Sequence, residues 1–286
     1  MPELPEVETL VRGLRKTVAG RRILRVTLGK TDFIDNPGDL ERHLPGARIA
    51  AIERYGKFFL LRLARYPSAA PHQALLVHLG MTGHLAAYAP AEPPAPHTHV
   101  VMALDDGREL RYSDPRRFGR MALLDAAAIA AALARVGLEP LTATARDFAA
   151  RLGLRRARIK ALLLDQRAVG GVGNIYADES LWRARLHPAR LAATLAPAQW
   201  RALHRALQSV LAQAIRLRGS SISDYRDAEG RRGEFQRLHR VYDREGRPCR
   251  RCRASIRRII VAGRSSHFCP QCQPRSNRGQ RAPKRH

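Results

Sequence analysis

All four cysteines of the chain lie in one short segment near its C-terminus. Cys249 and Cys252 form one Cys-x2-Cys pair, and Cys269 and Cys272 form a second pair sixteen residues later. Two thiolate pairs at this spacing can enclose a tetrahedral zinc ion between hairpins, and four thiolates leave no open position on the metal. A redox motif is the alternative, but that chemistry is typical of a lone Cys-x2-Cys near a βαβ unit. We therefore predict a ribbon that folds around one structural Zn²⁺.

The net charge predicts a polyanionic partner. Among 286 residues, 51 are Lys or Arg and 25 are Asp or Glu, a formal charge of +26. Residues 226–286 hold 18 basic and five acidic residues, so half of the excess (+13) is C-terminal. This favours nucleic acid, with an anionic membrane surface as the weaker alternative. No apolar run is long enough for a membrane span and the N-terminus is acidic, so we expect a soluble, cytoplasmic protein.

Hydrophobic periodicity divides the chain into a β-rich part and a helical part. Val7, Leu10, Val11 and Leu14 follow helical spacing after Pro5, so we predict a short amphipathic helix that packs on a sheet. Helical spacing resumes at residue 126 and continues to Leu217. Strand-like runs lie between the two regions, at residues 22–28, 47–63 with a break at 55–56, 74–79, and 100–112 folded into a hairpin at 105–107.

These patterns predict four segments. They are a β-rich domain (1–135), a helical domain (136–240), a zinc ribbon (241–273) and a basic, disordered tail (274–286). Residues 66–71 and 89–96 are expected to be surface loops, and 137–140 a hinge. Residues 219–233 form a polar loop without periodicity, which is functional or disordered.

Two turns carry residue types that suit nucleic acid. The Gly-rich stretch 169–175 precedes a helix, where Asn174 could act as N-cap and backbone N–H groups could approach a phosphate; a plain interhelical turn is the alternative. At 113–119, paired arginines stand beside Phe118, and Arg can bond a base edge while Phe enters between base steps. Ordinary packing is the alternative there, and for Met81 in its Gly-flanked turn.

The N-terminus is a candidate nucleophile. If Met1 is removed, Pro2 presents a secondary amine that can attack a carbon and form an iminium ion, and Glu3 beside it could transfer protons. A poorly ordered terminus is the alternative. The chain has only five Lys against 46 Arg, so Lys57 in a strand and Lys160 in a helix also draw interest, because an ammonium can titrate and guanidinium cannot.

Five motifs taken in order resemble bacterial formamidopyrimidine-DNA glycosylases. They are residues 2–9 (PELPEVET), 78–83 (HLGMTG), 114–119 (DPRRFG), 171–176 (GVGNIY) and the four-cysteine ribbon, so that the resemblance runs from residue 2 to about 273. It implies an α+β, bilobal protein. An N-terminal β-sandwich with a short helix would be followed by a helix-two-turn-helix domain and a zinc ribbon of four cysteines, with DNA between the lobes.

The resemblance also implies a role for individual residues. Pro2 would be the nucleophile at C1′ of the damaged nucleotide and Glu3 the acid/base. Glu6 would support that site, and Lys160 would lie near the lesion pocket. Met81, Arg116 and Phe118 would fill the gap left by the extruded base. The residues implied to grip DNA around the lesion are Lys57 and Arg264, both counted with the catalytic site, and His78, His99, Arg117 and Asn174.

The implied activity is that of a bifunctional glycosylase and abasic-site lyase. It would remove 8-oxoguanine opposite cytosine and ring-opened formamidopyrimidines, acting as a monomer on double-stranded DNA. An endonuclease-VIII-like pyrimidine glycosylase and a noncatalytic damage-binding protein remain alternatives. The chain departs from the family pattern at Asp243 and Arg253, where glycine is common, so the turns of its ribbon are in question. The loop 65–73 and the tail resemble additions, and residues 219–240 would close over the lesion.

Overall fold

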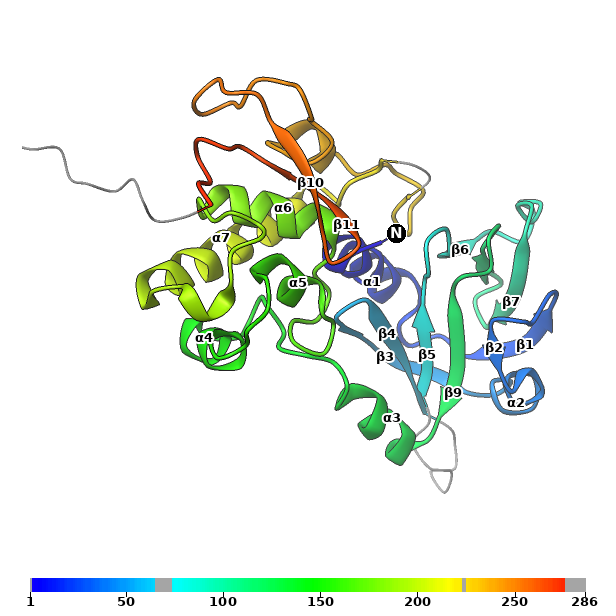
Figure 1. Cartoon of the computed structure of the whole chain (residues 1–286). Helices are drawn as coiled ribbons and strands as arrows, with labels where there is room; N and C mark the ends of the chain where they lie inside the picture. Colours follow the sequence, from blue (N-terminus) through cyan, green and yellow to red (C-terminus); the bar gives the residue numbers. More distant parts are fainter. Residues whose placement is uncertain (1, 65–73, 223–224, 276–286) are drawn as a thin grey trace, which may run out of the picture. The chain divides into compact units, whose positions relative to one another are not determined.

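The computed structural model describes residues 2–64, 74–222 and 225–275 (Figure 1). Contacts divide the chain into two compact units, one built from residues 1–136 and 213–236 and the other from 137–212 and 237–286. Residues 213–236 therefore belong with the N-terminal unit, whereas the sequence placed the loop 219–240 in the helical domain. The predicted domain boundaries stay predictions. Met1, the loop 65–73, Ser223, Asp224 and the tail from residue 276 lie outside the described residues.

Two mainly antiparallel sheets form the core of the N-terminal unit. One sheet has the strand order β1-β7-β8-β6 and the other β2-β9-β5-β4-β3, in which only β2 and β9 pair in parallel. Their inner faces contribute to a single hydrophobic cluster, so the unit is a β-sandwich, as predicted. The strands are β1 (Ile23–Leu28), β2 (Ile34–Asp35), β3 (Arg48–Tyr55), β4 (Phe58–Ala64), β5 (Ala74–His78), β6 (His84–Tyr88), β7 (Thr98–Leu104), β8 (Glu109–Ser113) and β9 (Arg120–Leu124).

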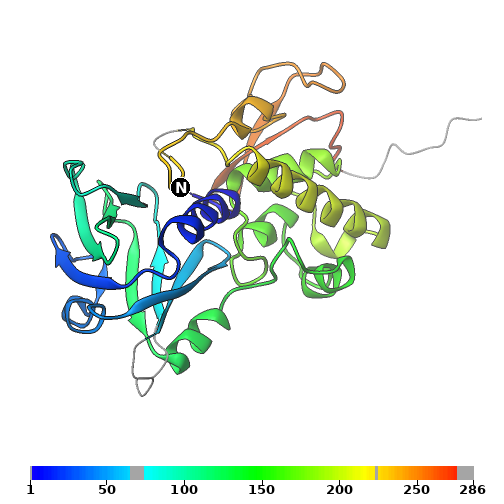
Figure 2. The same ribbon diagram turned by 180° about the vertical axis from the view of Figure 1, so that it is seen from behind.

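Helix α1 (Leu4–Val18) packs on this sandwich along its apolar face. Val7, Leu10, Val11 and Leu14 are fully buried in the shared core, and the helix contacts β3, β4 and β6 (Figure 2). The predicted helix is confirmed, although it begins at Leu4 rather than after Pro5. Pro5 suits the first turn because proline lacks the N–H that the first turn leaves unbonded.

The outer face of the five-stranded sheet carries a second, smaller core. Successive residues of β4 alternate between the two faces: Phe59 and Leu61 belong to the main cluster, while Leu60 packs with Ile129 of α3 (Ala126–Leu133). The short helix α2 (Pro37–His43) contacts β1. Helix α3 thus covers the outer face of the five-stranded sheet, whose strand β5 ends at His78.

The second unit contains helices and a two-stranded ribbon. Its helices are α4 (Ala145–Gly153), α5 (Ile159–Leu164), α6 (Asn174–Arg183), the 3-10 turn η1 (Ala192–Thr194) and α7 (Pro197–Arg216), whose last residues join the first unit. Within the described residues, no helix is long and apolar enough to cross a membrane. The ribbon consists of β10 (Arg257–Val261) and β11 (Arg264–Phe268), and η2 (Phe235–Leu238) precedes it.

Two neighbouring acids of α6 hold the ribbon. The buried Glu179 carboxylate accepts hydrogen bonds from the backbone N–H groups of residues 240, 241 and 242, at 2.9–3.0 Å. Asp178 Oδ2 accepts one from the His267 N–H at 2.9 Å. Burial raises the pKa of Glu179, and the three N–H donors oppose that rise. The approach to the ribbon and its second strand are therefore fixed to the same helix.

Candidate functional site

The start of α1 is an ordered and buried segment. Pro2 and Glu3 are both buried, and the Glu3 N–H donates to Glu6 Oε2 at 2.8 Å, in the manner of a capping box. Pro2 directly precedes this capped turn. The disordered-terminus interpretation therefore does not fit residues 2–6, and the candidate nucleophile and candidate acid/base lie side by side at a fixed helix start.

Glu6 also binds the loop that follows α7. Its second carboxylate oxygen accepts the Ser220 N–H at 2.7 Å, and its backbone carbonyl accepts the Tyr225 hydroxyl at 3.0 Å. Gly219 has φ +79°, and a Cβ there would lie 2.5 Å from Glu6 Oε1. This close approach requires glycine. Glu6 therefore joins the N-terminal turn to the base of the loop predicted to cover the lesion.

Lys57, which the sequence placed in a strand, lies instead in the tight turn between β3 and β4. Gly56 has φ +58°, and the Arg54 guanidinium donates to the Gly56 carbonyl at 3.2 Å. Arg54 in turn donates to Glu8 of α1 at 2.8 Å, and both side chains are largely buried. Glu8 thus explains part of the acidic cluster near the N-terminus: it fixes the turn that carries Lys57, which is itself 7% exposed.

His78 is held as a neutral imidazole beside Lys57. Burial, helped by the positive charge of Lys57, lowers the pKa of His78 to about 4. The Gly80 N–H donates to His78 Nδ1 at 3.1 Å, which assigns the proton of the neutral ring to Nε2. An Nε2–H group is a donor that can bond a phosphate oxygen without carrying charge.

The three predicted gap-filling side chains are exposed on two adjoining turns. Met81 is 40% exposed and Phe118 57% exposed, while the Arg116 guanidinium lies 4.5 Å from the centre of the Phe118 ring. Ordinary packing would have buried Met81 and Phe118, so the packing alternative is wrong for both. We call residues 78–83 the Met81 turn and residues 113–119 the Arg116 turn.

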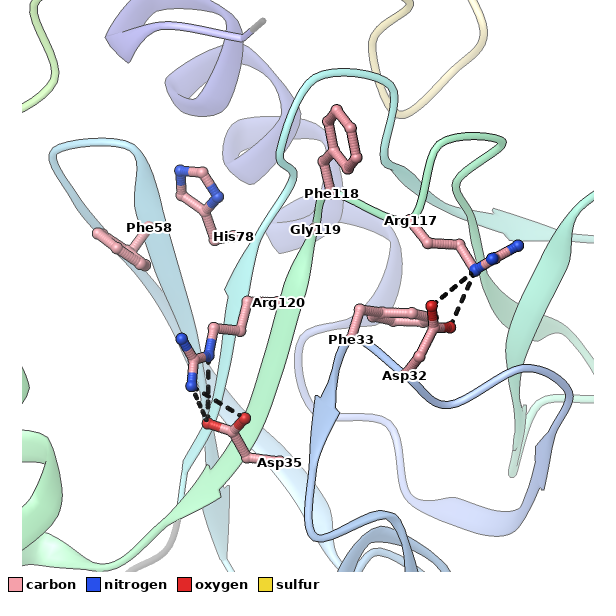
Figure 3. Close-up of a pocket in the computed structure, with 9 residues that line it drawn as sticks. All are labelled: Asp32, Phe33, Asp35, Phe58, His78, Arg117, Phe118, Gly119 and Arg120. Atoms are coloured by element: carbon pink, nitrogen blue, oxygen red, sulfur yellow. Dashed lines mark hydrogen bonds and ion pairs between the residues drawn. The ribbon is translucent and has the colours of Figure 1, made fainter.

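A hollow of about 590 Å³ adjoins these turns (Figure 3). His78 and three phenylalanines line it together with two ion pairs, Arg117 with Asp32 at 2.9 Å and Arg120 with Asp35 at 3.1 Å. Arg117 has φ 52°, a left-handed conformation that turns its side chain toward Asp32. Its predicted DNA contact would therefore compete with an existing ion pair.

In the second unit, Lys160 is a wholly buried cation. Its Nζ lies 2.7 Å from Asp178 Oδ1 and donates to the Ser265 carbonyl at 2.6 Å, and both side chains of the ion pair are fully buried. Ser265 follows Arg264, an exposed residue that opens β11 after the Ala262–Gly263 turn. Lys160 therefore holds the ribbon next to Arg264, and its predicted supporting role remains a prediction.

Two other predicted DNA contacts have buried polar atoms without a partner among the described residues. They are Oδ1 of Asn174 and Nε2 of His99. Asn174 is the first residue of α6, whereas the N-cap is Gly173, so the predicted N-cap at Asn174 is wrong. The extended Gly173 takes the cap position, which leaves the Asn174 amide free of that task. His99 is only 6% exposed and lies beside Phe33.

The four cysteines fit a tetrahedral zinc ion. Their sulfurs lie within 4.8 Å of one another, with separations of 3.4 Å for Cys252–Cys269 and 4.0 Å for Cys249–Cys272. Zinc–sulfur bonds of about 2.3 Å would place the sulfurs about 3.8 Å apart. Backbone N–H groups of residues 251 and 272 point at the sulfurs of Cys249 and Cys269, both at 3.4 Å, which favours thiolates.

The two departures from the resemblance occur where the backbone is left-handed. Asp243 has φ 54° and Arg253 has φ 68°, so both adopt a conformation that glycine adopts without strain. The Arg253 N–H donates to the Cys249 carbonyl at 2.9 Å, which closes the turn around the first cysteine pair. These two residues therefore carry a local backbone strain that glycine would avoid.

Together, the β-sandwich, the helical unit and the cysteine ribbon define a class of two-unit α+β proteins with a four-cysteine ribbon. Family models match along the chain: the formamidopyrimidine-DNA glycosylase N-terminal domain at residues 1–121, the H2TH domain of the same enzymes at 136–226, and the zinc finger found in FPG and IleRS at 246–275. The chain belongs to the formamidopyrimidine-DNA glycosylase family, and its ribbon is a zinc finger for one structural zinc.

Individual relatives are similar to this protein over nearly the whole chain. The formamidopyrimidine-DNA glycosylases of Chloroflexus aggregans and Herpetosiphon aurantiacus are 47% and 45% identical, covering 96% of this chain and 98% and 100% of theirs. The Thermus thermophilus MutM (FPG) structure has a TM-score of 0.83 at 43% identity. A Lactococcus lactis FPG complex with Fapy-dG DNA has a TM-score of 0.85 at 33% identity. These structures cover 96% and 95% of this chain and the whole of their own. The predicted family and fold class are confirmed.

Proposed function

We propose that this protein is a bifunctional DNA glycosylase and abasic-site lyase that removes oxidised purines in base excision repair. Its substrates would be 8-oxoguanine opposite cytosine and ring-opened formamidopyrimidines. The observation that carries the proposal is the buried, capped Pro2–Glu3 start of α1, in a chain of which a formamidopyrimidine-DNA glycosylase covers 96%. The bacterial relatives favour action in the bacterial cytoplasm, at the nucleoid.

Pro2 would supply the nucleophile once Met1 has been removed. Its secondary amine attacks C1′, the glycosidic bond breaks, and the damaged base leaves with a proton. Glu3 then protonates the ring oxygen O4′, so that the sugar opens to an iminium ion. Acid/base help of this kind contributes about 10² to 10⁴ in rate. Glu6 would keep this turn in place through its bonds to Glu3 and Ser220.

The iminium ion would also drive strand cleavage. It withdraws electrons from C1′, so loss of a C2′ proton expels the 3′ phosphate, and a further proton loss expels the 5′ phosphate. Both leaving groups are phosphates, which is why cationic and neutral donors are needed around the sugar. Lys57, His78, Asn174 and Arg264 are our candidates for these contacts, with His78 donating from its neutral Nε2.

Everting the base requires something to occupy the place it leaves. Unstacking costs about a few kcal/mol, and side chains that insert between base steps offset part of it. Met81, Arg116 and Phe118 are exposed on adjoining turns and suit this task. Arg116, stacked on Phe118, would face the cytosine left without a partner.

Borohydride trapping tests the proposal. Borohydride reduces an iminium ion, so mature protein with an 8-oxoguanine duplex should form a covalent adduct that Pro2→Gly abolishes. Glu3→Gln should lose base excision while duplex binding stays nearly intact. Binding without an adduct would instead indicate a damage-binding protein. Trapping that is faster on duplexes with oxidised pyrimidines would indicate the endonuclease-VIII-like activity.

A further inference from the structure

Asp114 belongs to the Arg116 turn, bonds to the Met81 turn through Thr82, and is completely buried. Its carboxylate accepts four hydrogen bonds. Oδ1 accepts the Thr82 hydroxyl at 2.5 Å and the Arg116 N–H at 3.3 Å, and Oδ2 accepts the Gly119 N–H at 2.8 Å and the Tyr112 hydroxyl at 3.1 Å. None of these four donors is a cation, so the buried charge is balanced by directed bonds from neutral groups.

The four donors come from two segments, the Met81 turn and the continuous stretch of β8 and the Arg116 turn. Thr82 follows Met81 in the Met81 turn, while residues 116 and 119 flank Phe118 in the Arg116 turn. Tyr112 belongs to β8, and its side chain is fully buried. One carboxylate therefore ties both turns to each other and to the sheet beneath them.

Close backbone packing reinforces the same junction. Gly80 has φ +60°, and a Cβ there would lie 2.3 Å from the carbonyl carbon of Phe118. A Cβ at Gly119 would lie 1.8 Å from the Tyr112 hydroxyl oxygen. These glycines allow the turns to touch through their backbones, so neither turn can shift unless the other one moves.

We propose that Asp114 is a positioning residue that makes Met81, Arg116 and Phe118 enter DNA as one rigid body. This inference rests on the proposed glycosylase function and adds a residue to it. Exposed side chains on independent turns would each have to be ordered on binding, which weakens insertion. A shared buried anchor removes that requirement, because the backbones that carry the three side chains are held in one fixed arrangement.

The prediction concerns eversion and leaves the chemistry at Pro2 untouched. Excising 8-oxoguanine requires expulsion of a stacked, paired base, whereas a preformed abasic site has no base to expel. Loss of the anchor should therefore slow single-turnover excision of 8-oxoguanine more than incision at an abasic site. Each hydrogen bond to a buried charged group contributes on the order of tenfold.

Two matched variants test this anchor. Thr82→Val and Tyr112→Phe each remove one hydroxyl donor from the same carboxylate, but Thr82 belongs to a turn and Tyr112 to the sheet. Thr82→Val also removes the acceptor of the Arg116 N–H at 3.4 Å, so it loosens the junction of the two turns at both bonds. We expect Thr82→Val to lower the ratio of 8-oxoguanine excision to abasic-site incision about tenfold, and Tyr112→Phe to change it less than about threefold. A 2-aminopurine next to the lesion should report slower unstacking with Thr82→Val.

The outcomes separate the inference from the proposed function. Wild-type protein that neither incises abasic DNA nor forms an adduct would overturn the proposed function. Active wild-type protein whose ratio is unchanged by Thr82→Val would overturn the anchor. Asp114→Asn, which puts an amide donor against two existing donors, should lower the ratio further. If that variant fails to fold, the Thr82→Val and Tyr112→Phe pair still decides the question.

Discussion

Removing the positive charge of Lys160 should destabilise the second unit more than any exposed substitution there. Lys160 and Asp178 are both fully buried, and Lys160 also donates to the Ser265 carbonyl. Lys160→Met would leave the Asp178 carboxylate buried beside the backbone N–H of His267 at 2.9 Å and its ring Nδ1 at 3.4 Å, with no lysine to balance the charge. Breaking one side of a buried ion pair costs about 3–5 kcal/mol. At about 2–4 °C per kcal/mol, the melting temperature should fall by about 6–20 °C.

Calorimetry of the zinc-loaded protein measures this effect. The matched control is Arg155→Met, since Arg155 pairs with Asp165 at 3.0 Å in the same unit but both side chains are more than a third exposed. An exposed pair contributes about 0–1 kcal/mol, so this variant should melt within a few degrees of wild type. The double variant Lys160→Met with Asp178→Leu removes both charges and should recover much of the loss.

Two results would contradict a buried, uncompensated charge as the cause of the instability. If Lys160→Met and Arg155→Met had the same melting temperature, burial would not determine how much an ion pair contributes to stability. If the double variant were no more stable than Lys160→Met, the loss would come from packing and not from an uncompensated charge.

Three further predictions concern the ribbon, the α1–β3 ion pair and the loop base. Chelating zinc should unfold the ribbon and weaken DNA binding; zinc-free protein with unchanged affinity would exclude that role. Burial raises the pKa of Glu8, but its bonds from Arg54 and Arg12 outweigh this and hold it below 4.5. The stabilising effect of ionised Glu8 is therefore present above pH 4.5 and is lost below it. Glu8→Gln should lower the free energy of unfolding, measured with urea, by about 2 kcal/mol at pH 7. The difference should shrink progressively as the pH falls below 4.5. Gly219→Ala should lower lesion cleavage more than Gly230→Ala, because both have positive φ but only the first meets Glu6; equal losses would point to backbone strain alone.

Local pattern predicted the large elements well. Alternation in residues 47–63 and helical spacing at Val7–Leu14 each reflect one buried face, so the sequence alone reveals them. Four short elements were missed: α2, β2, β6 and β9 span two to seven residues and carry no clear local pattern. Their partners in the sandwich stabilise them, and no local signal identifies those partners.

The site divides in the same way. Pro2, Glu3 and the cysteine pairs were visible because their chemistry depends on position or spacing along the chain. Asp114 and Glu179 were missed as anchors, since their donors lie as far as 32 and 63 residues away. A carboxylate's long-range partners follow from the fold, and only the Asp-Pro turn hinted at a structural task for Asp114.

The Glu6 contact limits how this enzyme could be redesigned. Lesion preference could be altered by grafting in the segment between α7 and η2 from another family member. A graft that begins after Ser220 would retain the Gly219–Ser220 clasp on Glu6 and leave the N-terminal turn intact. A graft that replaces the clasp would disturb the helix start that carries Pro2, and altered selectivity would then be confounded with damaged chemistry.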